Sequence, residues 1–245
     1  MPMVRIHPLL SILINICMSK KTAICYLTCN KNVSKMEERY KKLPDQDYST
    51  YIISDFKDNL KYSNSINHFE YSFNNYIKEP INIIYATFAS IYDLHKLEQY
   101  DYIWLLEDDV VFNGDFENFF NFYKNEEYDL ICPHYTLNDK SSWWTLYSNL
   151  IRGNYKTKIP TAGGLGQIFR FSKKIIEIMI FLTEKGIYAH HEVFPFTVCN
   201  LENLTYHSII DDNLLNKEYF DYNKRFHEKD LENIPSNLLV HSIKF

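Results

Sequence analysis

Apolar runs of strand length alternate with segments of helical periodicity along this chain. Four runs are apolar enough for buried strands and end in polar residues: Lys21–Thr28, Tyr51–Ser54, Tyr100–Leu106 and Tyr128–Cys132. A fifth strand is expected at Gln167–Phe171, directly after a stretch that is rich in glycine, Gly163–Gly166. A further apolar run, Leu238–Val240, lies close to the C-terminus and is followed by His241.

Helices are predicted between these strands. Their expected bounds are Ser34–Lys42, Asn82–Leu97, Asp115–Tyr123, Ser172–Lys185 and His191–Leu201. Ser172 is a suitable N-cap, Gly186 ends a helix, and Pro195 is tolerated in a first turn. Two polar or irregular segments, Asp58–Asn75 and Asp139–Lys158, are predicted to be loops.

This alternation predicts an α/β fold with a mixed, mainly parallel central sheet flanked by helices. There is no internal repeat and no segment that resembles a linker, so a single domain is expected over residues 18–245. Residues 1–17 are predicted to be an extension outside this domain. Their apolar run, Pro8–Cys17, is shorter than the roughly 20 residues that span a bilayer. Any membrane contact is therefore expected to be peripheral and confined to residues 1–17.

Composition and charge narrow the classes of partner. Apolar residues make up 46% of the 245 residues, which is ample for a packed core. The net charge of −5 and the absence of a long basic run argue against a nucleic-acid partner. An acidic chain that binds a phosphate-bearing ligand usually needs a cation to offset the charge.

The five cysteines do not form a zinc-binding pattern. They are Cys17, Cys25, Cys29, Cys132 and Cys199, and none of them belongs to a CxxC pair. An odd number without such a pair indicates free thiols in a reducing compartment, so a cytoplasmic location is expected.

The strongest candidate for chemistry is the acidic triplet Glu107-Asp108-Asp109, which directly follows an apolar strand. Ligands of open α/β sheets bind outside the carboxyl ends of strands. Adjacent carboxylates repel each other unless a cation or hydrogen bonds compensate, and Mn²⁺ or Mg²⁺ is a suitable cation. The alternative interpretation is an exposed acidic turn that precedes the next helix.

The surrounding stretch, YDYIWLLEDDVVFNGDFENFF, resembles the DxD region of GT-A glycosyltransferases. The resemblance extends in element order over roughly residues 21–245 and implies a GT-A-like, Rossmann-like catalytic domain. Residues 18–132 would form its nucleotide-binding half and residues 133–245 its acceptor half. It implies that Asp109 binds Mn²⁺ or Mg²⁺, with Glu107 and Asp108 supporting the nucleotide sugar. The first acid is Glu where the motif has Asp, which leaves its role open.

Two features further along the chain agree with this resemblance. Many GT-A enzymes supply a third metal ligand from a C-terminal His, and His241 matches that position, although a lone His is more often structural. Inverting members place an acid at a helix start beneath the acceptor hydroxyl, and Glu192 matches it as a general base. The alternative role for Glu192 is to stabilise a helix N-terminus.

Residues with weaker support complete the predicted site. Gly163, Gly164 and His191 are expected on the acceptor side, where Trp143 and Trp144 would form a shelf that stacks on sugar rings. The two glycines resemble the glycine turn that precedes the acceptor-side strand of GT-A folds. Thr28 and Asp55, at the ends of the first two strands, are expected to contact the nucleotide sugar.

The predicted function is transfer of a sugar from a nucleotide sugar to a hydroxyl of a glycan or glycoprotein acceptor, with inversion. A UDP-sugar such as UDP-GlcNAc or UDP-Glc is the preferred donor. A retaining reaction stays open if Glu192 is not the base. Two other functions stay open: a metal-dependent nucleotidyltransferase, and a glycan-binding or structural descendant of the fold that lacks catalysis.

Overall fold

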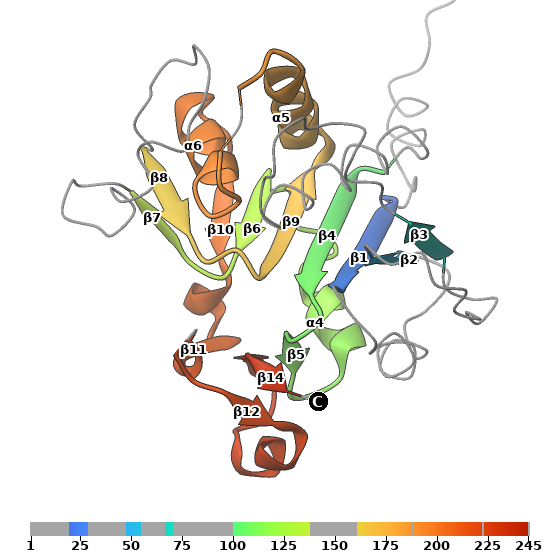
Figure 1. Ribbon diagram of the computed structural model, residues 1–245, viewed down its shortest axis with the longest axis vertical. Helices are drawn as coiled ribbons and strands as arrows, with labels where there is room; N and C mark the ends of the chain where they lie inside the picture. Colours follow the sequence, from blue (N-terminus) through green and yellow to red (C-terminus); the bar gives the residue numbers. More distant parts are fainter. Residues whose placement is uncertain are drawn as a thin grey trace, which may run out of the picture.

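The computed structural model is built around a seven-stranded mixed sheet (Figure 1). It describes residues 20–28, 48–54, 67–70, 100–137, 161–187, 189–221 and 223–244. The strands are, in sheet order, β3 (Asn67–Glu70), β2 (Tyr48–Ser54), β1 (Thr22–Thr28), β4 (Tyr102–Glu107), β9 (Ile168–Ser172), β6 (Leu130–Cys132) and β10 (Tyr206–Ser208). β9 runs antiparallel to both of its neighbours, whereas the other neighbouring strands are parallel.

The strand order contains a reversal of winding at the centre of the sheet. From β1 the chain adds β2 and then β3 on one side, and it returns to place β4 on the other side of β1. In open α/β sheets, such a switch point creates a crevice outside the carboxyl ends of the two strands, where ligands bind. A ligand-binding site is therefore expected at the carboxyl ends of β1 and β4.

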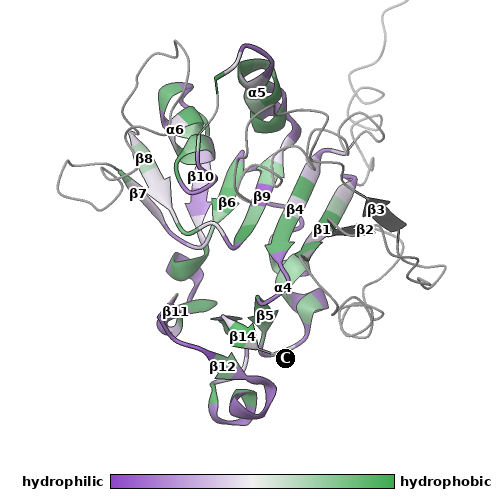
Figure 2. Ribbon diagram, in the orientation of Figure 1, coloured by the Kyte–Doolittle hydropathy of each residue, from purple (hydrophilic) through white to green (hydrophobic). Residues whose placement is uncertain are grey.

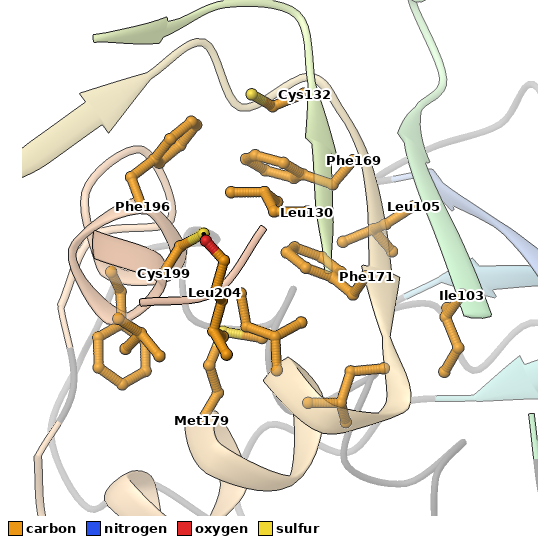
Figure 3. Close-up of a cluster of buried hydrophobic side chains, with 14 of the residues drawn as sticks. Ile103, Leu105, Leu130, Cys132, Phe169, Phe171, Met179, Phe196, Cys199 and Leu204 are labelled. Carbon is orange, nitrogen blue, oxygen red and sulfur yellow. Dashed lines mark hydrogen bonds between the residues drawn. The ribbon is translucent and has the colours of Figure 1, made fainter. Parts of the chain in front are cut away.

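Side chains of the central strands alternate between two apolar layers, as the period of two in a strand requires. Ile103 and Leu105 of β4 join Phe169 and Phe171 of β9 in the layer covered by α5 (Lys173–Glu184) and α6 (Phe194–Leu201), as Figure 3 shows. Both faces of β4 are buried, which explains why Tyr102–Leu106 is continuously apolar, whereas Arg170 interrupts the apolar run of β9 and is buried as well.

The opposite layer is dominated by aromatic rings. Trp104 of β4 is almost fully buried against Phe119 and Phe120 of α4 (Phe116–Phe122), with ring centroids 5.4 Å away in each case. Asp115 caps α4 by accepting a hydrogen bond from the backbone N–H of Glu117. The high aromatic content is thus used for core packing here.

A small three-stranded sheet follows β4 and contains the C-terminal part of the chain. β5 (Val111–Phe112) pairs antiparallel with β13 (Leu239–His241), and β13 pairs parallel with β11 (Leu215–Phe220). The remaining short elements are β7 (Tyr135–Leu137), β8 (Ala162–Gly164), η4 (Ile209–Asp212), β12 (Phe226–His227), η5 (Glu228–Asn233) and β14 (Ile243–Lys244). Figure 2 shows that the segment around β12 is more hydrophilic than the central strands.

Asn113 connects β5 to the segment that precedes β13. Its side-chain amide donates to the backbone carbonyls of Leu231, Ile234 and Pro235, at 3.0, 2.8 and 3.3 Å. Its main chain bonds to Leu238 and Asn237. One half-buried side chain therefore fixes how the last strands approach the sheet.

The structure confirms the α/β class and the mainly parallel sheet, with few helices among the described residues. Strands lie at all five predicted places, and the helices α4 and α5 begin and end within a residue or so of their predicted bounds. The predicted helices Ser34–Lys42 and Asn82–Leu97, the loop Asp139–Lys158 and the extension 1–17 lie outside the described residues. None of the described helices is long and apolar enough to cross a membrane.

Three predictions about local structure are wrong. The segment Asp58–Asn75 contains an edge strand, β3, because main-chain pairing with β2 and not an apolar pattern defines it. Gly163 and Gly164 belong to strand β8, which pairs with β7, and do not form a turn. The predicted helix at His191 begins only at Phe194, because His190 O first accepts turn hydrogen bonds from Val193 and Phe194.

Asn113→Ala is expected to lower the free energy of unfolding by about 1–3 kcal/mol, because backbone carbonyls lose their donor. Chemical denaturation would measure it. Asn200→Ala, at an exposed position near the end of α6, is the matched control and should change stability by less than about 0.5 kcal/mol. Equal effects of the two substitutions would contradict the anchoring role of Asn113.

Candidate functional site

Three side chains from two distant parts of the chain meet at the carboxyl end of β4: Glu107, Asp109 and His241. One potential ligand atom from each lies within 4.8 Å of the other two. His241 Nε2 is 3.3 Å from Asp109 Oδ1 and 3.9 Å from Glu107 Oε2. We refer to these three residues as the acid–histidine cluster.

Main-chain hydrogen bonds hold the cluster together. Glu107 is the last residue of β4, and the backbone N–H of Val110 closes a turn onto its carbonyl at 3.1 Å. The pairing of Val111 with Val240 then places His241 next to that turn. The backbone N–H of Ile243 donates to the Asp109 carbonyl at 3.0 Å. The main chain before and after His241 is therefore bonded to the segment that follows β4.

Exposure of the three side chains is graded. Their exposed fractions are 38% for Glu107, 18% for Asp109 and 7% for His241. The imidazole is packed against the ring of Phe220, with centroids 5.3 Å apart. The imidazole is thus buried, and the two carboxylates are the members of the cluster that solvent reaches.

The donor set suits a divalent cation with mixed oxygen and nitrogen preference. Carboxylates suit Mg²⁺, Ca²⁺ and Mn²⁺, and an imidazole suits transition metals such as iron and zinc. The carboxylates of Glu107 and Asp109 also lie close enough to repel each other, and a bound cation would remove that repulsion. The acid–histidine cluster is therefore a possible metal-holding group, and Mn²⁺ or Mg²⁺ stays a prediction from the sequence.

A second, buried group of polar residues begins with Glu192, whose side chain is 6% exposed. Glu192 lies in the turn before α6, and its carbonyl accepts a hydrogen bond from the backbone N–H of Gly164 at 3.1 Å. Its own N–H donates to His190 Nδ1 at 3.2 Å, and the rings of His190 and His191 stack with centroids 4.5 Å apart. We refer to Glu192, His190 and His191 as the Glu192–histidine group.

Burial shifts the pKa of every member of this group toward the neutral form. Desolvation raises the pKa of Glu192 to about 7, although a hydrogen bond from the Gln167 side chain lowers it in part. Desolvation lowers the pKa of His190 to about 4 and, with a contribution from His190, that of His191 to about 3. His190 Nδ1 and Glu192 Oε2 are 3.8 Å apart, but they do not form a salt bridge at neutral pH because the imidazole is uncharged.

Two glycines allow the chain to pass close to this group. A Cβ at position 166 would lie 2.2 Å from His191 Cδ2 and 3.0 Å from Glu192 Cγ. A Cβ at position 164 would lie 2.1 Å from the backbone oxygen of His134. Both positions require glycine because the neighbouring backbone and rings occupy the space of a side chain.

The structure brings together some of the residues predicted from the sequence. Asp109 and His241, predicted as metal ligands, are adjacent, and Glu107 joins them, whereas the half-buried Asp108 is outside the group of potential ligands. Gly164 and His191, expected on the acceptor side, lie against Glu192 or beside it. Gly163 is buried in β8.

Other predicted residues cannot be placed with the cluster. Thr28 is the last residue of β1, at the switch point, and the structure describes its backbone only. Asp55, Trp143 and Trp144 lie outside the described residues.

One residue of the site was missed at the level of sequence. Gln167 is buried, with 2% exposure, and its backbone carbonyl accepts the N–H of Glu107. Its position directly after the glycine stretch and before a strand was visible in the sequence, but its contacts depend on pairing between β4 and β9.

Asp109→Asn and His241→Ala should each weaken Mn²⁺ binding more than about 10-fold, because the first removes the negative charge of one of the three converging groups and the second removes the imidazole. Isothermal titration calorimetry of the purified chain would measure the change. The exposed Asp211→Asn is the control and should leave the affinity unchanged. Mn²⁺ affinity that is equal in all three variants would show that the cluster does not bind the metal.

The stability of the wild type relative to Glu192→Gln should depend on pH. The folded protein keeps a proton on Glu192 up to about pH 7, whereas the unfolded carboxyl releases it near its ordinary pKa. The stabilisation is therefore complete below about pH 4.5 and is lost as the pH rises through about 7, a change of about 3 kcal/mol.

Chemical denaturation at a series of pH values would measure this difference. The comparison with Glu192→Gln is needed because His190 and His191 also make stability depend on pH. Their lowered pKa values destabilise the fold of both proteins as pH falls below about 6.5. A difference that stays constant from pH 4.5 to 8 would contradict the raised pKa of Glu192.

Comparison with known proteins does not assign the chain to a family. No protein-family model matches it, and no curated sequence is significantly similar to it. What the site can do is therefore inferred from the geometry, burial and chemistry of its own residues.

Proposed function

We propose that this protein is a metal-dependent glycosyltransferase with a GT-A-like fold. It transfers a sugar from a nucleotide sugar, preferably a UDP-sugar, to a hydroxyl of a glycan or protein-linked acceptor. The observation that carries this proposal is the acid–histidine cluster at the switch point of the sheet, close to a buried carboxyl whose pKa is near 7.

The position of the cluster supports a nucleotide-sugar donor. It lies at the carboxyl end of β4, next to β1, where the winding of the sheet reverses and where α/β proteins bind nucleotides. Glu107 and Asp109 are acidic and would repel a diphosphate on their own. A cation held by Glu107, Asp109 and His241 would offset both charges and stabilise the departing diphosphate as a Lewis acid.

The environment of Glu192 supports a role as general base. A base works best when its pKa lies near the working pH, and burial raises the pKa of Glu192 to about 7. The Glu192 carboxylate takes the proton of the acceptor hydroxyl while the hydroxyl oxygen attacks the anomeric carbon. The bond from that carbon to the nucleoside diphosphate breaks on the opposite face, so the product has inverted configuration.

His190 and His191 support this role by being neutral. Imidazolium neighbours would pair with the Glu192 carboxylate and weaken it as a base. Because burial keeps both imidazoles uncharged above about pH 4, they orient the turn without neutralising the carboxylate. His190 does so by accepting the backbone N–H of Glu192.

Free thiols agree with the proposed cytoplasmic location. Cys25, Cys132 and Cys199 are buried and are not in disulfides. Buried free cysteines such as these three, which are the ones in the described part of the chain, are typical of a chain that matures in a reducing compartment.

The proposal is tested with a panel of nucleotide sugars, with and without Mn²⁺, on the wild type, Asp109→Asn and Glu192→Gln. The wild type is expected to bind or hydrolyse at least one donor in a metal-dependent way. Asp109→Asn should lose that dependence. Glu192→Gln should still bind metal and donor, and should lose transfer by about 10²- to 10⁴-fold.

The outcomes separate the parts of the proposal. Absence of metal-dependent binding for every donor would reject the glycosyltransferase. Full transfer by Glu192→Gln would reject the base and leave a retaining reaction open. The anomeric configuration of the product, read by NMR, checks inversion directly.

A further inference from the structure

Two neighbouring side chains of the Glu192–histidine group each bury a polar atom that makes no hydrogen bond within the described part of the chain. The two atoms are Glu192 Oε1 and His191 Nδ1. The Glu192 side chain is 6% exposed, so its oxygen is well inside the fold. Buried polar atoms of folded proteins are nearly always hydrogen-bonded. Two such atoms on adjacent residues therefore indicate a place where a ligand supplies the missing bonds.

The two side chains border the same point of the facing segment. A Cβ added at position 166 would lie 2.2 Å from His191 Cδ2 and 3.0 Å from Glu192 Cγ. The N–H of Gly164 donates to the Glu192 carbonyl at 3.1 Å and holds the turn against this segment. His191 as a residue is half-buried, so the group reaches the surface there. The two open hydrogen-bonding positions are thus side by side and close to solvent.

His190 holds both side chains in place. Its Nδ1 accepts the backbone N–H of Glu192 at 3.2 Å, and its ring stacks on that of His191 with centroids 4.5 Å apart and planes at 23°. Groups that are fixed before a ligand arrives lose little freedom when it binds. The arrangement is therefore suited to selecting a ligand by the spacing of its polar groups.

The chemistry of the two atoms indicates hydroxyl groups. An ionised carboxylate oxygen only accepts, whereas an imidazole nitrogen donates or accepts according to its tautomer. A hydroxyl does both, so a pair of hydroxyls satisfies Glu192 Oε1 and His191 Nδ1 in either tautomer. A sugar ring carries such pairs on neighbouring carbons, whereas the side chain of serine or threonine carries one hydroxyl.

The charge of the group disfavours an anionic ligand. Burial lowers the pKa of His190 to about 4 and that of His191 to about 3, so neither imidazole supplies a cation near neutral pH. A carboxylate or phosphate placed here would meet the Glu192 carboxylate with no positive partner from these residues, and like charges repel.

We propose that the Glu192–histidine group selects an uncharged sugar as acceptor by binding hydroxyls on two neighbouring carbons, one at Glu192 and the other at His191. The inference rests on the proposed function. The hydroxyl at Glu192 gives its proton to the carboxylate while its oxygen attacks the anomeric carbon of the donor. The hydroxyl at His191 keeps its proton and orients the ring, which makes His191 a residue that determines specificity.

The first experiment uses the wild type and a series of acceptors. Transfer is measured to the methyl glycosides of glucose, galactose and mannose, and then to deoxy analogues of the best one that lack a hydroxyl next to the reacting carbon. One of these analogues should lower kcat/KM roughly 10- to 100-fold, because a buried atom loses its partner. The corresponding methyl uronate and N-acetylserine amide should be at least as poor. Equal rates for the parent sugar and all deoxy analogues would overturn the proposal.

The second experiment replaces the imidazole. His191→Phe keeps a ring that can stack on His190 and removes Nδ1, whereas His191→Asn retains a side chain that hydrogen-bonds near the position of Nδ1. His191→Phe should lower kcat/KM for the parent sugar roughly 10- to 100-fold and no longer distinguish it from the poor deoxy analogue. His191→Asn should restore part of that discrimination. The KM for the donor should stay within about 2-fold.

A purely structural role for His191 would give a different result. Both acceptors would then slow to the same extent in His191→Phe, and the discrimination between them would be unchanged, which would overturn the proposal. The deoxy series on the wild type needs no substitution, so it decides the question if His191→Phe does not fold.

Binding without donor separates this inference from the proposed function. Saturation-transfer NMR with the three methyl glycosides reports binding to the wild type and to His191→Phe. Binding that depends on His191 in a protein that transfers no sugar supports the sugar site and rejects the glycosyltransferase. Transfer that ignores both the neighbouring hydroxyl and His191 keeps the glycosyltransferase and rejects this inference. Absence of both binding and transfer rejects both.

Discussion

The antiparallel pairing of β4 with β9 is the constraint on which the rest of the site depends. It inserts one reversed strand into an otherwise parallel sheet and ends with the hydrogen bond between Glu107 N–H and the Gln167 carbonyl. Because that bond lies at the carboxyl end of β4, the segment that leads into β9 passes along the edge where α/β sheets bind ligands. The glycines of this segment then let the turn with Glu192 approach.

The return of the chain through β13 is the second requirement. Without a partner for β5, the acidic residues after β4 would form a charged turn with no imidazole beside it. Pairing of β5 with β13 adds a buried imidazole, and Asn113 fixes the approach of this last segment. The first pairing brings the segment with Gln167 to the end of β4, and the second brings His241 to the turn that follows β4.

Much of the fold could be predicted from the sequence because its signals are local. The run from Tyr102 to Leu106 is buried on both faces, and a run of that kind is recognisable without knowledge of its neighbours. The cap of α4 at Asp115 and the cap of α5 at Ser172 are likewise local. By contrast, β3 and β8 are defined by their partners, and their own residues are polar or glycine, so no apolar pattern indicates them.

The candidate site likewise combines features with local signals in the sequence and features that depend on distant partners. Asp109, His241 and Glu192 could be named from residue type and position, but their separations depend on pairing between distant strands. Gln167 is an example: a neutral amide carries no chemical signal in a sequence, and its place beside Glu107 follows only from the pairing of β4 with β9. The raised pKa of Glu192 was similarly hidden, since it follows from burial by residues from several elements.

The acid–histidine cluster has a consequence for biosynthesis. Its imidazole is translated long after its two acids, so a growing chain has an incomplete set of these three side chains until β13 has been made and paired. If the cluster binds a cation as proposed, that cation would stabilise only the finished fold, by about 2.7 kcal/mol at a concentration 100 times its dissociation constant. Metal availability in the cell would then influence how much of the newly made chain survives proteolysis, before any reaction takes place.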